Sequence, residues 1–280
     1  RVVAEICAGF NDPHQTLVWR TPKGKQALAR RARHAMMAEA LRAEGGTHLL
    51  LGHTADDQVE TFLMRARQGS TWYGLAGMQP IALSPVWPEG QGVRIARPVL
   101  KRSRADLREE LERRGVDWID DPSNRNPAYE RVRVRTLLAG QERLKTRILA
   151  CQARLQDLRR LEERLIAHWM REQVSIDGEG VFRLDLSGLP EERLIRALGV
   201  MLQIVGGRET PPRKDAVEPL AMRLTSDKPF SGATLGGVMI YRNRDDVSLA
   251  PEPEVSGDAA EEKLARARFA AIRSLYGAGT

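Results

Sequence analysis

The stretch LLLGHTADDQVETFLMRARQGSTWYGLAGM, residues 49–78, decides the predicted fold. An apolar run over residues 48–53 is typical of a short buried strand. The run breaks into the polar cluster HTADDQ, and helical spacing follows over about residues 56–67. In an open α/β sheet, ligands bind in the crevice beyond the carboxyl ends of the strands, so this polar cluster is expected to line such a crevice.

The residues before this stretch complete a strand–helix–strand pattern. Residues 15–19 (QTLVW) predict another short buried strand. Residues 25–44 carry apolar side chains at helical spacing, namely Leu28, Ala32, Ala35, Met36, Ala40 and Leu41. A strand, a helix and a strand in succession predict a parallel βαβ unit with a right-handed crossover, and therefore an α/β protein.

The middle of the chain continues this alternation and then turns helical. Residues 93–100 (VRIARPVL) predict a strand that runs into a loop. A helix is expected over 103–115, with Ser103 as its N-cap and Gly115 as its C-cap. Residues 136–175 are almost wholly helical, and we expect one apolar stripe there to pack on the α/β domain: Leu144, Ile148, Leu155, Leu158, Leu161 and Leu165.

The remainder predicts a small second domain and a tail. Within residues 181–250 we expect a strand (VFRLDL), two helices over 190–205 and about 213–224, and a hairpin in GATLGGVMIYRNRDDVSLA. After Pro251 the composition indicates a linker, and residues 259–275 recover a helical pattern.

Composition limits the class of protein. The 280 residues are 42% hydrophobic and 29% charged, enough for a sizeable core in one large or two modest domains. The sequence contains neither the roughly 18–20 consecutive apolar residues of a membrane span nor a signal-peptide pattern, so a cytoplasmic location is expected. Cys7 and Cys151 belong to no metal-binding spacing, and we expect free thiols without structural zinc.

Basic residues are unevenly spread. The formal net charge is +7, and residues 129–165 hold ten basic side chains against five acidic ones. Such a zone fits a polyanion such as nucleic acid, although solvated helical faces of basic proteins look similar. The segment GSTWYGLAG could present Trp72 and Tyr73 for base stacking, or either side chain could pack on the core.

Two carboxylates are the first candidates for a functional site. On a regular helix Asp57 and Glu60 lie three residues apart and share a face, whereas Asp56 points elsewhere. The pair could hold a ligand ammonium group or a magnesium ion. The ordinary alternative is that acidic residues in a first turn complement the helix dipole.

Arginines form two further candidate groups. Arg30 and Arg33 share a face of the preceding helix and could reach phosphate oxygens, or they could belong to a solvated basic face. The segment RVRVR would place Arg131, Arg133 and Arg135 on one face if it is extended, and would fan them out if it is helical.

Together these pieces resemble the tRNA(Ile)-lysidine synthetase family of the PP-loop, or N-type ATP pyrophosphatase, group. The resemblance is close over about residues 15–138 and looser to about residue 250. It rests on five segments in order: ARRARH (29–34), GHTADDQVET (52–61), GLAGM (74–78), RPVL followed by KR (97–102), and WIDDPSN with RVRVR (118–135).

The resemblance implies a reaction and roles for several residues. ATP adenylates the C2 oxygen of the wobble cytidine, C34, in a tRNA(Ile) with a CAU anticodon, and the side-chain amine of free lysine then displaces AMP to give lysidine. Asp57 and Glu60 match carboxylates that hold the lysine ammonium and help it lose a proton, which fits the chemistry because an ammonium is no nucleophile. Arg33 and Arg135 match arginines near the phosphate and the activated base.

Binding residues and partners follow in the same way. Arg30, His53, Arg131 and Arg133 are predicted to bind ATP or tRNA. The implied cofactors are ATP and Mg²⁺, and the residues that hold the metal are left open. The implied partners are tRNA(Ile) and free lysine, without a membrane and with a second copy of the chain as a further candidate.

The implied architecture is α/β, a Rossmann-like parallel sheet with connecting helices and a small α+β second domain. We expect a PP-loop adenylation domain over 1–138, connecting helices over 139–175, a tRNA-binding domain over 176–250, and a linker with a C-terminal helix over 251–280. The family's Ser-Gly-Gly-x-Asp-Ser loop, which grips ATP, is not among these residues. We expect it upstream of Arg1, and we expect a protein of just this extent to be inactive.

Two alternatives stay open. One is a tRNA thiolase of the PP-loop group, although thiolases that modify cytidine depend on cysteines, commonly in CxxC pairs, and Cys7 and Cys151 form none. The other is an RNA-binding relative without catalytic activity. The sequence departs from the family's commoner residues at His34, Val132 and Thr71, and none of these departures removes a charged group assigned above.

Overall fold

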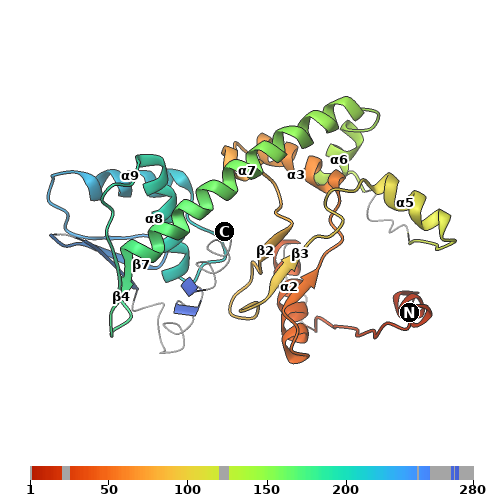
Figure 1. The fold of residues 1–280 in the computed structure, drawn as a ribbon, viewed down its shortest axis with the longest axis horizontal. Helices are drawn as coiled ribbons and strands as arrows, with labels where there is room; N and C mark the ends of the chain where they lie inside the picture. The colour runs from red at the N-terminus through yellow and green to blue at the C-terminus, as the bar shows by residue number, and fades with distance from the viewer. Residues whose placement is uncertain are drawn as a thin grey trace.

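A computed structural model describes residues 2–20, 26–119, 126–244, 246–252, 266–267 and 269–270. An N-terminal part with a small sheet and a C-terminal part with a larger sheet lie at the two ends of one long helix, α7 (Glu142–Gln173), which crosses the molecule (Figure 1). No helix in the described ranges combines the length and the apolar character needed to cross a membrane.

The N-terminal sheet has the order β1-β3-β2. Strand β1 (His48–Leu50) pairs in parallel with β3 (Arg94–Ala96), and β2 (Ile81–Leu83) pairs antiparallel with β3. Helix α2 (Gln26–Ala43) precedes β1 and confirms the helix that the apolar spacing of residues 25–44 predicts. The sheet is therefore mixed, and β2 follows β1 after two helices whereas β3 follows β2 directly.

Two predictions about strands are wrong. Residues 15–19 are not a strand in the structure, because no neighbouring strand supplies them with a hydrogen-bonded ladder among the described residues, and Val18 is 67% exposed. The run over 48–53 shortens to three residues and is not fully buried, since Leu50 is 66% exposed. Because β1 is an edge strand of the described sheet, one of its sides and part of its face stay open.

Helix α3 (Ala55–Arg67) starts where the polar cluster predicts, and Thr54 is its N-cap. Helix α5 (Arg104–Arg113) has Ser103 as N-cap, but its C-cap is Arg114, and Gly115 follows in the left-handed region at φ 63°. A glycine just after the C-cap supplies this conformation without steric cost.

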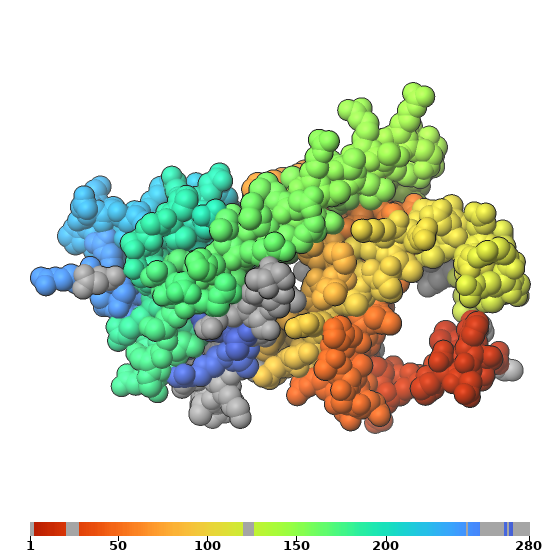
Figure 2. Space-filling model, in the orientation of Figure 1, coloured from red at the N-terminus to blue at the C-terminus, as the bar shows by residue number. Residues whose placement is uncertain are grey.

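Several short elements complete this part of the chain. Helix α1 (Val2–Gly9) lies against the end of α5 (Figure 2), and residues 12–19 after it have no regular secondary structure. Helix α4 (Trp72–Leu75) forms a single turn. The segment RVRVR is helical and belongs to α6 (Glu130–Leu137), which settles the choice between an extended and a helical conformation.

Helix α7 packs through a different face than the leucine stripe. Ile148 is buried as expected, but the other leucines of the stripe are largely outside the core, and four of them are 36–53% exposed: Leu144, Leu158, Leu161 and Leu165. The buried face carries Gln152 and Glu163 in its middle and Ile166 and Met170 further on. The middle of the helix faces the backbone of residues 75–78, whose carbonyl groups need hydrogen-bond donors rather than methyl groups.

The C-terminal part is built on an antiparallel sheet with the order β4-β5-β8-β7-β6. Its strands are β4 (Val174–Ile176), β5 (Phe182–Leu184), β6 (Ala233–Thr234), β7 (Val238–Arg242) and β8 (Val247–Pro251). Leu249 pairs with Phe182 on one side and Ile240 on the other, and all three are at most 1% exposed.

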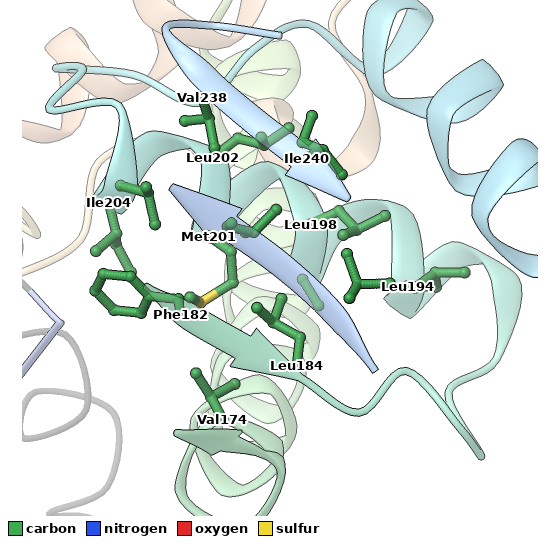
Figure 3. Packing of buried hydrophobic residues seen from close by; sticks show 14 of the residues in the cluster. Val174, Phe182, Leu184, Leu194, Leu198, Met201, Leu202, Ile204, Val238 and Ile240 are labelled. Atoms are coloured by element: carbon green, nitrogen blue, oxygen red, sulfur yellow. The ribbon is translucent and has the colours of Figure 1, made fainter. Parts of the chain in front are cut away.

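Helices α8 (Glu191–Val205) and α9 (Lys214–Thr225) lie where the sequence predicts helices. Leu198, Met201 and Leu202 of α8 point into the sheet and form the larger hydrophobic core (Figure 3). Burying one such side chain contributes about 1.5–3 kcal/mol, so this core holds the C-terminal part together. The predicted linker and tail helix, 251–280, fall mostly outside the described residues, of which 266–267 and 269–270 are helical.

Candidate active site

The first turn of α3 fixes Asp57 in a capping box. Asp57 Oδ2 accepts hydrogen bonds from the backbone N–H and the hydroxyl group of Thr54, both at 2.8 Å, and the Asp57 N–H donates to Thr54 Oγ1 at 3.4 Å. These contacts are the ordinary structural role of an acidic residue at this position. They use one carboxylate oxygen and leave Asp57 Oδ1 facing away from the cap.

That second oxygen accepts a hydrogen bond from Arg104 Nη2 at 2.6 Å. Burial alone would raise the pKa of Asp57, but the hydrogen bond from the Thr54 backbone and the charge of Arg104 outweigh it, so the pKa is lowered. Burial likewise opposes the charge on Arg104, whereas its bonds to Glu60 and Asp57 raise its pKa. Both groups are therefore charged at neutral pH.

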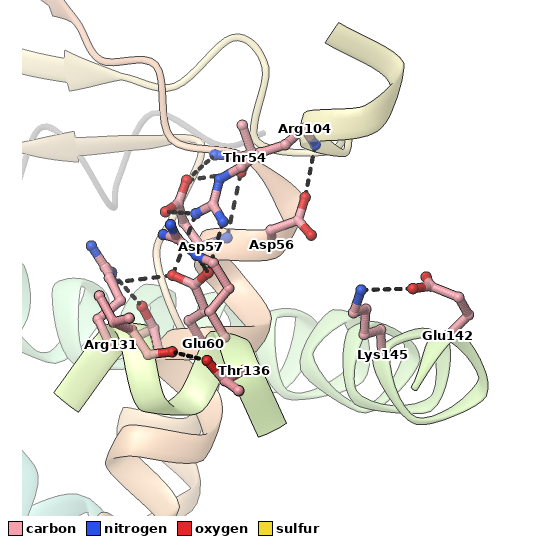
Figure 4. Close-up of polar contacts among 12 residues, drawn as sticks. Thr54, Asp56, Asp57, Glu60, Arg104, Arg131, Thr136, Glu142 and Lys145 are labelled. Atoms are coloured by element: carbon pink, nitrogen blue, oxygen red, sulfur yellow. Dashed lines mark hydrogen bonds and ion pairs between the residues drawn. The ribbon is translucent and has the colours of Figure 1, made fainter. Parts of the chain in front are cut away.

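Glu60 is the centre of the cluster and is 1% exposed. Its carboxylate forms ion pairs with Arg104 Nη1 at 2.8 Å, Arg135 Nε at 3.0 Å and Arg131 Nε at 3.2 Å (Figure 4). A buried carboxylate is stable only when it is paired and hydrogen-bonded. Helices α3, α5 and α6 thus meet at one acidic side chain.

The helical conformation of α6 separates its arginines. Arg131 and Arg135, four residues apart, both reach Glu60. Arg133 lies on the opposite side and donates to the carbonyl groups of Pro127 and Ala128 at 2.9 and 3.0 Å. Of these three predicted site residues, the structure brings Arg131 and Arg135 to the carboxylates and turns Arg133 away from them.

A second cluster near the strand ends brings His53 and Arg97 together beside Arg30. His53 Nδ1 and Arg97 Nε are buried and have no hydrogen-bond partner among the described residues. Burial, and then the charge of Arg97, lower the pKa of His53; burial, and then the charge of Arg30, lower the pKa of Arg97. Buried nitrogens without hydrogen-bond partners, beside the mutually repelling charges of Arg30 and Arg97, fit an anionic ligand such as a phosphate group.

Helix α2 contributes less to these clusters than predicted. The exposed Arg30 acts on His53 and Arg97 through its charge. Arg33 is exposed too, and no hydrogen bond or ion pair links it to Asp57 or Glu60 among the described residues. Its neighbour Arg31 instead pairs with Glu89 at 3.1 Å and with Glu209 at 2.6 Å. The role of Arg33 stays a prediction.

The aromatic segment packs rather than forming an open loop. Tyr73 donates a hydrogen bond to Glu163, and the guanidinium carbon of Arg159 lies 4.2 Å from the centre of the Tyr73 ring. Burial raises the pKa of Tyr73 to about 12. Trp72 is half-buried and meets Tyr73 edge to face. Of the two interpretations of this segment, the structure favours core packing.

Glutamines join α3 and α7 to the GLAGM segment. Gln58 exchanges two hydrogen bonds of 2.8 Å with the backbone of Met78, and Gln152 donates to the carbonyl of Gln58 at 3.2 Å. Gly77 has φ 77° and lies so close to both side chains that a Cβ atom would come within 2.5 Å of Gln58 Oε1. This segment therefore supports the helix that carries Asp57 and Glu60.

Sequence reasoning missed Arg104 and Arg97 as site residues. Both lie in or beside the recognised segment RPVL-KR, but the spacing pointed only to a strand end and an N-cap at Ser103. An arginine beside a cap has no local signal for a partner 44 or 47 positions away. In the described ranges, no group of three His, Cys, Asp or Glu side chains is arranged to hold a metal ion.

Comparison with known proteins first defines a class. Residues 1–142, just over half of the chain, match the family model described as a PP-loop domain. The polar cluster at the strand ends and the mixed α/β arrangement lie within these residues. The chain therefore contains a PP-loop domain.

Full-length relatives define the family more narrowly. The chain is 48% identical to the tRNA(Ile)-lysidine synthase of Hyphomonas neptunium over 250 residues, 89% of this chain and 68% of the relative. It is 36% identical to that of Caulobacter vibrioides and 38% identical to that of Mesorhizobium japonicum, over 89% and 86% of this chain and 54% of each relative. The chain belongs to the tRNA(Ile)-lysidine synthase family, and it spans about half to two thirds of the length of these relatives.

Proposed function

We propose that the protein uses ATP to join free lysine to C2 of the wobble cytidine, C34, of a tRNA(Ile) with a CAU anticodon. The cytidine oxygen attacks the α-phosphate of ATP, and diphosphate leaves. The lysine side-chain amine then forms a bond to C2, the C2–O bond breaks, and AMP leaves with the oxygen. The observation that carries this proposal is the pairing of Asp57 and Glu60 with arginines of two other helices.

In this proposal the carboxylates bind the nucleophile. Asp57 and Glu60 hold the lysine ammonium and favour its loss of a proton, because only the neutral amine attacks. Arg135 and Arg33 stabilise the negative charge that passes to AMP. The name that the relatives share, tRNA(Ile)-lysidine synthase, supports the choice of substrate. The cluster of carboxylates and arginines supports the roles given to these charged side chains.

ATP and Mg²⁺ are the proposed cofactors. The unpartnered nitrogens of His53 and Arg97 fit phosphate oxygens, and Arg30 and Arg131 add positive charge beside them. Mg²⁺ would be held mainly by the phosphates that accompany it and would neutralise their charge. We also propose that the parallel pair of β1 and β3 is part of a Rossmann-like sheet.

The proposed partners follow from charge and family. The basic segment 129–165 fits tRNA(Ile), and Arg133 is exposed at its start. The C-terminal part, residues 176–250, is the proposed tRNA-binding domain. Binding should weaken steeply with salt, because phosphate contacts release counterions. The proposed location is the cytoplasm, and sedimentation would test whether two copies associate.

A single-turnover assay of the complete protein tests the proposal. Labelled lysine, ATP and tRNA(Ile) transcripts are mixed, and incorporation into C34 is followed together with AMP release. We expect one lysine per tRNA and one AMP per lysine. A protein that binds the tRNA but incorporates no lysine would support the alternative of an RNA-binding relative and overturn the ligase proposal. Transfer of sulfur in place of lysine would support the thiolase alternative.

A further inference from the structure

We propose that Arg104 occupies the position of the substrate's ammonium group, so that lysine binds Asp57 only after the Arg104 side chain withdraws. This inference rests on the proposed function, because it concerns the site where lysine is proposed to bind. Arg104 is in this account a gating residue rather than a catalytic residue.

The contacts of Arg104 are those that an ammonium group would make. Its Nη2 lies 2.6 Å from Asp57 Oδ1 and 3.3 Å from Glu60 Oε2, and its Nη1 lies 2.8 Å from Glu60 Oε1. No other described side chain carrying a positive charge pairs with both carboxylates. The guanidinium group therefore fills the space between them (Figure 4).

Charge balance favours the exchange. Arg104, Arg131 and Arg135 give three positive charges against the two carboxylates, an excess of one. A lysine ammonium added to this cluster would raise the excess and find no free carboxylate oxygen between Asp57 and Glu60. If Arg104 leaves, the incoming ammonium restores the same balance.

Arg104 lies on α5, which packs less closely on the neighbouring elements than α6 does. Its backbone N–H donates to Asp56 Oδ2 at 2.7 Å, and its side chain is 30% exposed, against 41% for Arg131 and 38% for Arg135. Neither α5 nor α6 has a buried residue within its bounds, but α5 extends outward from the N-terminal part, and its far end lies against α1 (Figure 1). Arg131 and Arg135 lie instead on α6, whose Val134 packs against a small core of Val59, Leu138 and Ile148.

The test measures lysine binding to the complete protein by calorimetry, in the wild type and in Arg104→Gln. Removing the competing cation is expected to tighten lysine binding about ten-fold. Norleucine, which has the same carbon chain without the side-chain ammonium group, should bind both proteins equally. Arg108→Gln, one turn further along α5, removes a charge that does not contact the carboxylates and should leave lysine affinity unchanged.

Further variants keep the test sharp. Arg104→Lys retains a positive charge, so its lysine affinity is expected to stay within about two-fold of the wild type. This difference is well below the ten-fold gain expected for Arg104→Gln. If thermal melting shows that Arg104→Gln is unfolded, Arg104→Met replaces it, because it keeps an unbranched apolar stem. The same gain in lysine affinity is expected from it.

Three results would overturn the inference in distinguishable ways. Lysine affinity that falls or stays unchanged in Arg104→Gln, while the wild type incorporates lysine into tRNA, would show that Arg104 only positions the carboxylates. The proposed function would then stand and the gate would not. If the wild type neither binds nor incorporates lysine, both fall together. An equal gain for norleucine would also contradict the gate, because norleucine has no side-chain charge to exchange with Arg104.

Discussion

Arg135 Nε lies 3.0 Å from Glu60 Oε1, although the two residues are 75 positions apart in the sequence. The contact joins α6 to the first half of α3 and closes a cluster that α5 also enters. Because Glu60 is buried, its charge and the positions of the three helices depend on one another. The first prediction follows from this dependence.

Glu60→Gln should destabilise the protein by about 2 kcal/mol, because three guanidinium groups lose their shared counter-charge. The loss stays moderate since those arginines are 30–41% exposed and water can reach them. Urea unfolding measures the change. Glu110→Gln is the control: Glu110 pairs with Arg113 and Arg114 at the surface, so its loss should leave the stability close to that of the wild type. Equal effects of both variants would contradict the role of Glu60.

Gly77→Ala should destabilise the protein more than Gly69→Ala does. The difference between the two losses measures the effect of the glutamine side chains that lie close to Gly77. Both glycines have positive φ, 77° and 69°, so an alanine is strained by about 1 kcal/mol at either site. Only at Gly77 would the new Cβ also meet Gln58 Oε1 and Gln152 Nε2, whereas nothing lies within 4 Å at Gly69. Denaturant midpoints of the two variants provide the comparison. An identical loss at both positions would mean that the glutamines move aside freely.

Tyr73→Phe should lower the free energy of unfolding by about 1.5–3 kcal/mol, because it removes the partly buried hydrogen bond to the carboxylate of Glu163. Tyr241→Phe, at a tyrosine that is 48% exposed, should stay within about 0.5 kcal/mol of the wild type.

The raised pKa of Tyr73, about 12, adds a pH dependence. The folded state keeps the proton longer than the unfolded state, so the stability from this group is complete below pH of about 10 and is lost as pH rises toward 12. Across this pH range the free energy of unfolding of the wild type should fall more steeply with pH than that of Tyr73→Phe. Equal pH dependence of the two proteins would argue against a buried phenol.

The lowered pKa of His53 should make the stability of the protein depend on pH in the opposite direction. Burial lowers its pKa, so the folded state resists protonation and the unfolded state does not. The associated stability is complete above about pH 6.5 and is lost as pH falls through the lowered pKa. A phosphate-bearing ligand at His53 should reverse part of this loss and take up a proton on binding. Calorimetry at pH 6 in buffers of different ionisation enthalpy measures that uptake, which should disappear in His53→Gln; an uptake that persists would place the anion elsewhere.

Local features of the fold could be predicted from the sequence, and contacts between distant residues could not. The start of α3, its cap, and the shared face of Asp57 and Glu60 follow from the period of the helix and from cap preferences. Nothing local indicates that Arg104 rather than Arg33 reaches these carboxylates, because that depends on how α2 and α5 are placed around the sheet.

The failed predictions have the same origin. The run at 15–19 has strand-forming residues, yet a strand also needs a neighbour to pair with. On α7 the leucine stripe is real in the sequence, but the face toward residues 75–78 carries Gln152 and Gln156, which donate to the backbone carbonyl groups of Leu75 and Ala76. Hydrophobic periodicity identifies the helix, and it cannot show that a neighbouring backbone needs polar partners.

The most direct test of the central claim compares two aspartates with the same local role. Asp57 and Asp106 each close a capping box, on α3 and on α5, but only Asp57 contacts the arginine cluster. In single-turnover assays of the complete protein, Asp57→Asn should reduce lysine incorporation into tRNA(Ile) by at least about a hundred-fold, within the range that proton-transfer groups contribute. Asp106→Asn should leave incorporation near the wild-type rate. Undiminished incorporation by Asp57→Asn, or an equal loss in both variants, would contradict the proposal that this carboxylate serves the lysine amine.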